Sequence, residues 1–232
     1  MLPIKDTIPH RETPFVVYFL IGINVLVFLF ELSLNPIERQ YFFYTFGLVP
    51  LKVTQNGFDI YSMFSNMFIH GGWFHLISNM WALWIFGDNV EDRMGHFRFF
   101  IFYIICGLIA NIVHYIFNEF SPVPVVGASG AIAGVMGAYM IMFPYSRIIT
   151  LIPIFLIPFF FEIPAVIFLF FWFFSQLISG TLHLFLTPQI GGIAWWAHIG
   201  GFLAGVILHR FFKIREHDYR EYFYDEIFSR YL

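Results

Sequence analysis

The sequence predicts an all-α fold, a polytopic bundle of six membrane-spanning helices with both termini in the cytoplasm. Three observations lead to this prediction: the composition, the long apolar segments and the distribution of basic residues. Of the 232 residues, 59% are hydrophobic, 22% are aromatic and only 12% are charged, whereas a soluble domain is about 45–50% apolar and about 25% charged. So few charged side chains cannot cover a water-soluble protein of this size, which excludes a soluble enzyme and a disordered chain.

Net charge and cysteine content exclude further classes. The chain has 12 Lys and Arg residues against 15 Asp and Glu residues, a formal net charge of -3, which gives no general attraction to nucleic-acid phosphates. We therefore expect no nucleic-acid partner. Cys106 is the only cysteine, so neither an intramolecular disulfide nor a thiolate zinc site is expected.

Six apolar segments are long enough to cross the hydrocarbon core, which takes about 20 residues in a helix. The predicted spans are residues 14–34, 60–86, 97–117, 123–142, 165–185 and 193–212. Together they define a membrane domain over residues 14–213, preceded by a charged cytoplasmic leader at residues 1–13. The protein is therefore expected to be an integral, multi-pass membrane protein whose surroundings are the lipid bilayer.

The segment between the fourth and fifth spans contains several prolines. Pro153, Pro158 and Pro164 suit a continuous membrane helix poorly, because proline has no N–H for the helical ladder. We interpret residues 148–163 as an interfacial or re-entrant link. The alternative is a longer, kinked fifth helix.

The basic residues predict the orientation of the chain. With six spans, both termini lie on one side, together with the connections after the second and fourth spans. All but two of the 12 Lys and Arg residues fall on that side, and the exceptions, Arg39 and Lys52, lie in the first loop. Basic residues concentrate in cytoplasmic loops, so both termini are predicted to be cytoplasmic.

The C-terminal residues 214–232 predict a short cytoplasmic amphipathic tail. Tyr219, Phe223, Ile227 and Tyr231 recur every four residues, with charged residues between them. This spacing favours a helix lying on the inner membrane surface. A solvated, partly frayed tail is the alternative.

Polar side chains at membrane depth are costly, so they are functional candidates by default. Ser129 lies in a GASG motif at residues 127–130, and His198 lies in an AHIGG motif at residues 197–201. The second span contains His70, His75 and Asn79. The predicted topology places all these groups in the outer half of the membrane, at comparable depth.

Small residues accompany these polar groups. Gly201 and Gly205 form a GxxxG spacing on one face with His198, and small residues let two membrane helices approach closely. Ser129 and His198 would then come within reach, and a neutral histidine is the usual base that activates a serine hydroxyl. Taken singly, each residue is more often a structural hydrogen-bonding group; their combination favours catalysis.

The order of these motifs resembles the rhomboid intramembrane serine proteases, in their compact six-helix bacterial form. The resemblance covers about residues 60–212. It depends on four motifs: FIHGGWFHLISN at 68–79, GDNVEDRMG at 87–95, GASG at 127–130 and AHIGGFLAG at 197–205. The GxSG pattern alone would be weak evidence, whereas all four motifs in this order are specific to the family.

The resemblance implies a role for each matching residue. Ser129 would be the nucleophile and His198 its general base, in a dyad that needs no carboxylate. His75 and Asn79, which share one helix face, would donate hydrogen bonds to the oxyanion. Supporting roles are predicted for His70, Gly127, Gly130, Gly201 and Gly205.

Three further positions bear on this comparison. Glu91 and Arg93 match a structural motif that organises a cytoplasmic loop. Some relatives have a tyrosine four residues after the serine, where it stacks on the base. Here that position is Ala133, so His198 must be oriented by another group.

The implied reaction is hydrolysis of a peptide bond in or near a transmembrane segment, through an acyl-enzyme. The expected substrates are single-pass membrane proteins, and no metal or other cofactor is needed. The fifth span, which is rich in Phe and Trp, is a candidate lateral gate, although lipid-facing aromatics are the alternative. The expected location is a bacterial inner membrane, with an organelle as the alternative; the oligomeric state is open.

Two other functions compete with proteolysis. One is a non-catalytic factor on the same fold that binds or traffics membrane proteins. The other is a small transporter whose proton path would run through the intramembrane histidines. These histidines are His70, His75, His114 and His198.

Overall fold

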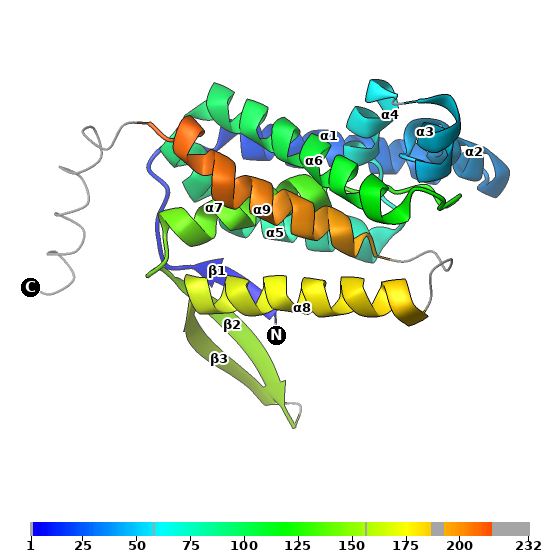
Figure 1. The fold of residues 1–232 in the computed structure, drawn as a ribbon. Coiled ribbons are helices and arrows are strands. Elements are labelled where there is room, and N and C mark those ends of the chain that lie inside the picture. Colours follow the sequence, from blue (N-terminus) through cyan, green and yellow to red (C-terminus); the bar gives the residue numbers. More distant parts are fainter. Residues whose placement is uncertain (1, 58, 156, 187–192, 215–232) are drawn as a thin grey trace, which may run out of the picture.

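The computed structural model describes residues 2–57, 59–155, 157–186 and 193–214 of the chain (Figure 1). The predicted tail at residues 214–232 lies outside this part except for Ile214. Long helices lie side by side along one axis and make up most of the molecule. They are α1 (Phe15–Ser33), α5 (Trp73–Met94), α6 (His96–Asn118), α7 (Ser129–Met142), α8 (Ala165–Leu186) and α9 (Trp195–Phe212).

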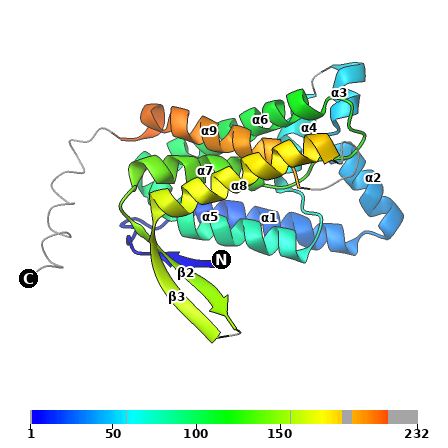
Figure 2. The ribbon, with the colours of Figure 1, turned by 60° about the horizontal axis from the view of Figure 1, so that its bottom comes forward.

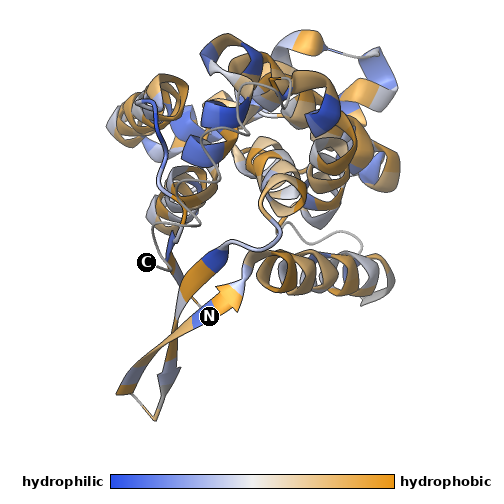
Figure 3. Cartoon of the chain, turned by 90° about the vertical axis from the view of Figure 1, so that its left-hand side faces the viewer, coloured by the Kyte–Doolittle hydropathy of each residue, from blue (hydrophilic) through white to orange (hydrophobic). Residues whose placement is uncertain are grey.

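The long helices follow the predicted apolar segments. Three of them, α1, α6 and α8, are long and apolar enough to cross a membrane, and α7 is a shorter apolar helix. Figure 3, which looks along the bundle, shows hydrophobic residues over most of its helices. The mostly helical fold is therefore confirmed, with three described helices that are long and apolar enough to cross a membrane. The number of six spans and the cytoplasmic termini stay predictions.

The second predicted span is not one continuous helix. It divides into α4 (Ile60–Ser65), the short 3-10 helix η1 (Asn66–Phe68) and α5, which begins only at Trp73. Gly71 and Gly72 occupy the break, and glycine costs a helix about 1 kcal/mol relative to alanine. The first loop also contains two helices, α2 (Pro36–Phe46) and α3 (Pro50–Asn56).

A small sheet corrects the all-α prediction. Strands β1 (Leu2–Asp6), β2 (Arg147–Ile154) and β3 (Ile157–Pro164) pair antiparallel in the order β1-β2-β3. The segment 148–163 is thus a β-hairpin and not the start of a longer, kinked fifth helix, while its interfacial or re-entrant placement stays a prediction. Figures 1 and 2 show this hairpin projecting from the bundle beside α8.

The composition of the hairpin explains its extended conformation. Its strands are rich in isoleucine and phenylalanine, which favour β-structure. Pro153 pairs with Pro158 near the turn, beyond the residues that pair with β1. Proline is tolerated where no further strand requires its missing N–H.

Helix α7 lies at the centre of the bundle. It contacts α5, α6, α8 and α9, and Figure 2 shows it enclosed by these helices. Most of its residues are buried, including Tyr139 near its C-terminal end. The first residue of this central helix is Ser129.

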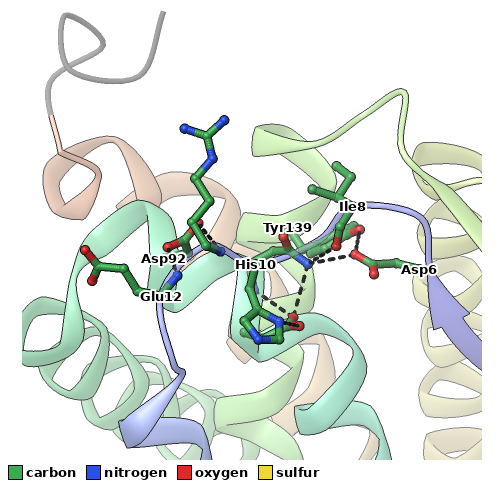
Figure 4. A network of polar contacts seen from close by, with 9 residues as sticks. Asp6, Ile8, His10, Glu12, Asp92 and Tyr139 are labelled. Atoms are coloured by element: carbon green, nitrogen blue, oxygen red, sulfur yellow. Dashed lines mark hydrogen bonds and ion pairs between the residues drawn. The ribbon is translucent and has the colours of Figure 1, made fainter. Parts of the chain in front are cut away.

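Polar contacts join the N-terminal segment to the C-terminal half of α7, at the end away from Ser129 (Figure 4). Asp6 accepts hydrogen bonds from Tyr139 Oη at 2.5 Å and from Asn89 Nδ2 at 2.8 Å. His10 Nδ1 lies 3.0 Å from the Asp88 carboxylate. We call these five residues the N-terminal network. Burial raises the pKa of Asp6 to about 7, and the nearby Asp88 charge acts in the same direction.

Glu91 organises the same end of the bundle. Its two carboxylate oxygens accept hydrogen bonds from the backbone N–H groups of Val16 and Val17, at 2.9 and 2.8 Å. These N–H groups belong to the first turn of α1, where no intrahelical acceptor is available. The negative charge also suits the positive end of the helix dipole.

Candidate active site

The close packing of α7 against α9 builds the site. A Cβ atom added at Gly201 would collide with the backbone oxygen of Gly130, and one added at Gly205 would collide with that of Gly134. The two helices therefore meet backbone to backbone. Small residues permit such an approach between membrane helices, and side chains at the first turns of α7 and α9 are brought together.

Ser129 and His198 lie side by side as a result. Ser129 is the first residue of α7, and His198 belongs to the first turn of α9. Ser129 Oγ lies 2.8 Å from His198 Nε2, a hydrogen-bonding distance. The arrangement has the geometry of a nucleophile next to its base.

Gln176 of α8 is a third member of the site that sequence reasoning missed. Its Oε1 lies 2.8 Å from His198 Nδ1, and the side chain is only 6% exposed. The signal in the sequence was an amide inside an otherwise apolar span, which is costly unless it has a partner. In this chain, where position 133 is alanine, Gln176 is the hydrogen-bonding partner of the His198 ring nitrogen that does not contact Ser129.

Aromatic rings border the histidine from two helices. The Trp172 ring of α8 lies 5.9 Å from the His198 ring, centroid to centroid. Trp195 of α9 approaches the imidazole edge-on at 6.2 Å. Both rings therefore pack close to the His198 side chain.

His75 and Asn79 lie beside the backbone that leads into Ser129. Gly127 has a φ of +126°, a conformation that L side chains rarely adopt. A Cβ atom at this position would lie 2.6 Å from His75 Nε2 and 3.6 Å from Asn79 Nδ2. Because position 127 is glycine, the side chains of His75 and Asn79 can lie next to the backbone that leads into Ser129.

The hydrogen bond that His75 accepts from Gly71 favours a ring protonated at Nε2, the nitrogen nearer to Gly127. Its Nδ1 accepts the Gly71 backbone N–H at 3.4 Å, so a neutral ring has its proton on Nε2. Asn79 Nδ2 lies 3.0 Å from His70 Nε2, which holds the amide in place. Both groups can present N–H donors to an oxygen above Ser129.

His70 is buried behind this pair. Its backbone N–H donates to the Glu31 carboxylate at 3.0 Å, and the Arg39 guanidinium lies 3.8 Å from the other Glu31 oxygen. His70 therefore joins α1, the first loop and α5. Glu31, which the sequence analysis did not single out, is the acidic residue of an apolar span, and that was its signal.

A cavity of about 430 Å³ opens onto the site. Such a volume holds several water molecules, each of which takes about 30 Å³ in the liquid. Within the described residues, no group of three or more His, Cys, Asp or Glu side chains is arranged to hold a metal ion. The cavity wall includes Ser129, His198, His75, Asn79, His114 and Ser78.

Comparison with known proteins places the chain among its relatives. It is 28% identical to RHOMBOID-like protein 1 of Arabidopsis thaliana over 73% of this chain and 39% of that protein. It is 30% identical to the mitochondrial Rhomboid protein 1 of Saccharomyces cerevisiae, over 59% of this chain and 39% of that protein. It is 32% identical to the rhomboid protease GluP of Bacillus subtilis, over 55% of this chain and 24% of that protein.

These relatives share only part of their length with the chain, which spans about two fifths or less of each. The relatives come from a plant, a yeast and a bacterium, and the yeast protein is named as mitochondrial. They therefore do not support the predicted location in a bacterial inner membrane. The family model described as the Rhomboid domain matches residues 57–214, which contain all four motifs and the whole site. The chain belongs to the rhomboid family.

Proposed function

We propose that this protein is an intramembrane serine endopeptidase that cleaves membrane proteins in or near their transmembrane segments. The observation that supports the proposal most directly is the 2.8 Å contact between Ser129 Oγ and His198 Nε2 at the wall of the cavity. Family membership supports it further, because relatives such as GluP are named as proteases. Each step of the reaction can be assigned to a group of this chain.

In the first half-reaction, Ser129 Oγ attacks the scissile carbonyl carbon while His198 Nε2 takes the hydroxyl proton. The carbonyl oxygen becomes an oxyanion beside His75, Asn79 and the Ser129 backbone N–H. Loss of one such donor typically lowers the rate by about 10²–10³. His198 then gives its proton to the leaving amine, and the acyl-enzyme remains.

In the second half-reaction, a water molecule from the cavity attacks the acyl-enzyme. His198 takes a proton from this water and returns it to Ser129 Oγ as the acyl group leaves. The site lies between helices that otherwise expose apolar side chains, so its water supply depends on the polar cavity. A hydrolytic step at membrane depth is feasible for this reason.

The substrate class follows from the surroundings of the site. Helix α8, next to His198, exposes Phe170, Phe171 and Phe174, an apolar surface suited to a transmembrane segment. The peptide bond of such a segment is shielded while it is helical. We therefore expect single-pass substrates that unwind readily near the site, whether the membrane is bacterial or that of an organelle.

The test combines a serine-directed probe with turnover. The purified full chain is treated with a fluorophosphonate and, separately, with a fluorogenic transmembrane substrate. The variants are Ser129→Ala, His198→Ala and the matched control Ser78→Ala, whose hydroxyl faces the same cavity and donates to the His75 carbonyl at 3.1 Å. Labelling and cleavage are expected in the wild type and in Ser78→Ala, and neither in Ser129→Ala. His198→Ala should lower kcat by about 10²–10⁴.

Two results would contradict the proposal. Labelling that survives in Ser129→Ala would show that another residue reacts with the probe. A folded wild type that neither reacts with the probe nor cleaves a broad panel of substrates would favour the non-catalytic binding factor. These two outcomes separate a wrong nucleophile from a wrong function.

A further inference from the structure

We propose that Gln176 is a positioning residue that holds His198 in the tautomer protonated at Nδ1. This inference rests on the proposed function, in which His198 Nε2 must accept the proton of Ser129. It adds to the dyad a third group, on a different helix, that has neither the charge nor the acidity of a carboxylate. The contacts of the two side chains support it in three steps.

The first step concerns the histidine. In the neutral ring only one nitrogen has a proton. Nε2 lies 2.8 Å from the Ser129 hydroxyl and can act as a base only when it is unprotonated. The proton must then be on Nδ1, which lies 2.8 Å from Gln176 Oε1. An amide oxygen only accepts hydrogen bonds, so this contact favours the catalytically competent tautomer.

The second step concerns the orientation of the amide. Gln176 Nε2 donates to the Trp172 carbonyl at 3.2 Å and to Ser175 Oγ at 2.9 Å. Ser175 Oγ itself donates to the Trp172 carbonyl at 2.6 Å, which leaves its lone pairs free to accept. A flipped amide would place its oxygen against the carbonyl and its N–H groups against Nδ1–H. The hydrogen-bond pattern therefore fixes the amide with Oε1 toward His198.

The third step concerns the surroundings. Gln176 is buried, so water does not readily replace it as the acceptor. In the described part of the chain, each nitrogen of the His198 ring has one hydrogen-bond partner, Ser129 or Gln176. All donors in this series point the same way, from Ser129 through His198 and Gln176 toward the α8 backbone. Loss of the amide would leave Nδ1–H without an acceptor, and the alternative tautomer would gain population.

A spectroscopic experiment tests the tautomer without relying on turnover. The full chain, labelled with ¹⁵N-histidine, is placed in lipid nanodiscs, and the His198 signals are assigned with His198→Ala. We expect a protonated Nδ1 and an unprotonated Nε2 in the wild type. Gln176→Leu, similar in volume, should shift the population toward the Nε2-protonated form. The control Ile178→Ala alters an exposed side chain of the same helix and should leave the spectrum unchanged.

Kinetics provide the second readout. General base catalysis contributes at least about 100-fold to the rate, and Gln176→Leu weakens it without removing His198. We therefore expect kcat to fall by about 10- to 100-fold and KM to stay within about twofold. Gln176→Glu restores an acceptor, so its kcat should exceed that of Gln176→Leu. Its negative charge stabilises the imidazolium, so the acidic limb of its pH–rate profile should move to higher pH.

The results separate this inference from the proposed function. An unchanged His198 tautomer in Gln176→Leu would overturn the positioning role, as would a folded Gln176→Leu variant with wild-type kcat. A tautomer shift in a protein that cleaves no substrate would support the positioning role while contradicting the protease assignment. Unfolding temperatures measured for each variant show whether lost activity comes from lost structure.

Discussion

The two ends of the helix bundle use different kinds of polar group. At one end, Ser129, His198 and Gln176 form a series of neutral hydrogen-bonding side chains between packed helices. At the other end, carboxylates such as Asp6 and Glu91 receive the hydrogen bonds that hold the N-terminal segment and α1. A buried charge is costly unless it is well paired, so neutral acceptors suit the end that lies among apolar helices.

Glu31 is the informative exception to this division. It is fully buried near the site, yet it is compensated by Arg39 at 3.8 Å and by the His70 N–H at 3.0 Å. Its carboxyl group therefore holds the backbone of His70, which in turn contacts Asn79. The comparison predicts that changes at the site end affect catalysis, while changes at the other end affect stability alone.

The largest effect is expected at the helix contact that supports the site. Gly205→Ala places a methyl group against the Gly134 backbone oxygen, and backbone cannot rotate away as a side chain can. We expect a loss of at least about 3 kcal/mol in the free energy of unfolding, the upper end of the usual cost of overpacking. Unfolding in mixed micelles measures the stability, and fluorophosphonate labelling reports whether Ser129 stays reactive.

Gly22→Ala is the matched control. Nothing lies within 4 Å of a Cβ atom added at Gly22 in α1, and alanine favours a helix by about 1 kcal/mol over glycine. This variant should be as stable as the wild type or slightly more so, with labelling retained. Equal behaviour of the two variants would mean that the α7–α9 contact is looser than described.

A smaller effect, on stability alone, is expected at Glu91. Glu91→Gln keeps one carbonyl acceptor but loses the charge and one of the two acceptors for the Val16 and Val17 N–H groups. Hydrogen bonds to charged groups contribute about 1.5–3 kcal/mol, so we expect a loss of about 1–3 kcal/mol. The same substitution at the exposed Glu119 should change little. If the folded molecules of Glu91→Gln have a lower kcat than the wild type, the two ends of the bundle do not have separate roles in catalysis and stability.

The smallest effect is a dependence of stability on pH from the N-terminal network. The pKa of Asp6 rises from 3.8 to about 7 on folding, so the folded protein keeps a proton that the unfolded chain releases. The stabilisation is complete below about pH 4 and is lost as the pH rises to about 7. The Asp88 carboxylate lies nearby, and Tyr139 donates a hydrogen bond to the Asp6 carboxylate.

Asp6→Asn isolates this contribution. An amide stays neutral, so the variant should show a flatter pH profile of unfolding between about pH 4 and 7, the range in which the Asp6 contribution changes. Hydrogen exchange of the β1 amides would show whether the N-terminal strand loosens as the pH rises in the wild type. If the wild type and the variant show the same slope, the pH dependence comes from other groups, such as Asp88, whose pKa is also raised by burial.

The sequence predicted most of the helical fold because apolar runs and motif spacing are local signals. The long helices follow these runs, and the family assignment from the four motifs is confirmed. The hairpin at 148–163 was missed because a run of isoleucine, phenylalanine and proline has no helical or alternating period that identifies a strand. Its pairing with Leu2–Asp6 depends on a contact more than 140 residues away in sequence.

The site divides in the same way. Ser129, His198, His75 and Asn79 occur in motifs, so they could be selected from the sequence, and their roles stay predictions for experiment. Gln176 and Glu31 occur in no motif, and their importance depends on which helix packs against which. Only the placement of α8 beside α9 shows that the amide at 176 faces a histidine 22 positions further along.

The position of Gln176 has a pharmacological consequence. Helix α8 is the least buried of the three long apolar helices, with 22% of the residues in its most apolar stretch buried, against 28% for α1 and 44% for α6. Gln176, the acceptor proposed to hold His198, thus belongs to the least buried of these three helices. On the proposed function, a hydrophobic compound bound between α8 and α9 would separate Gln176 from His198 and inhibit catalysis without occupying the cavity at Ser129. Such an inhibitor would be non-competitive and would need no serine-reactive group.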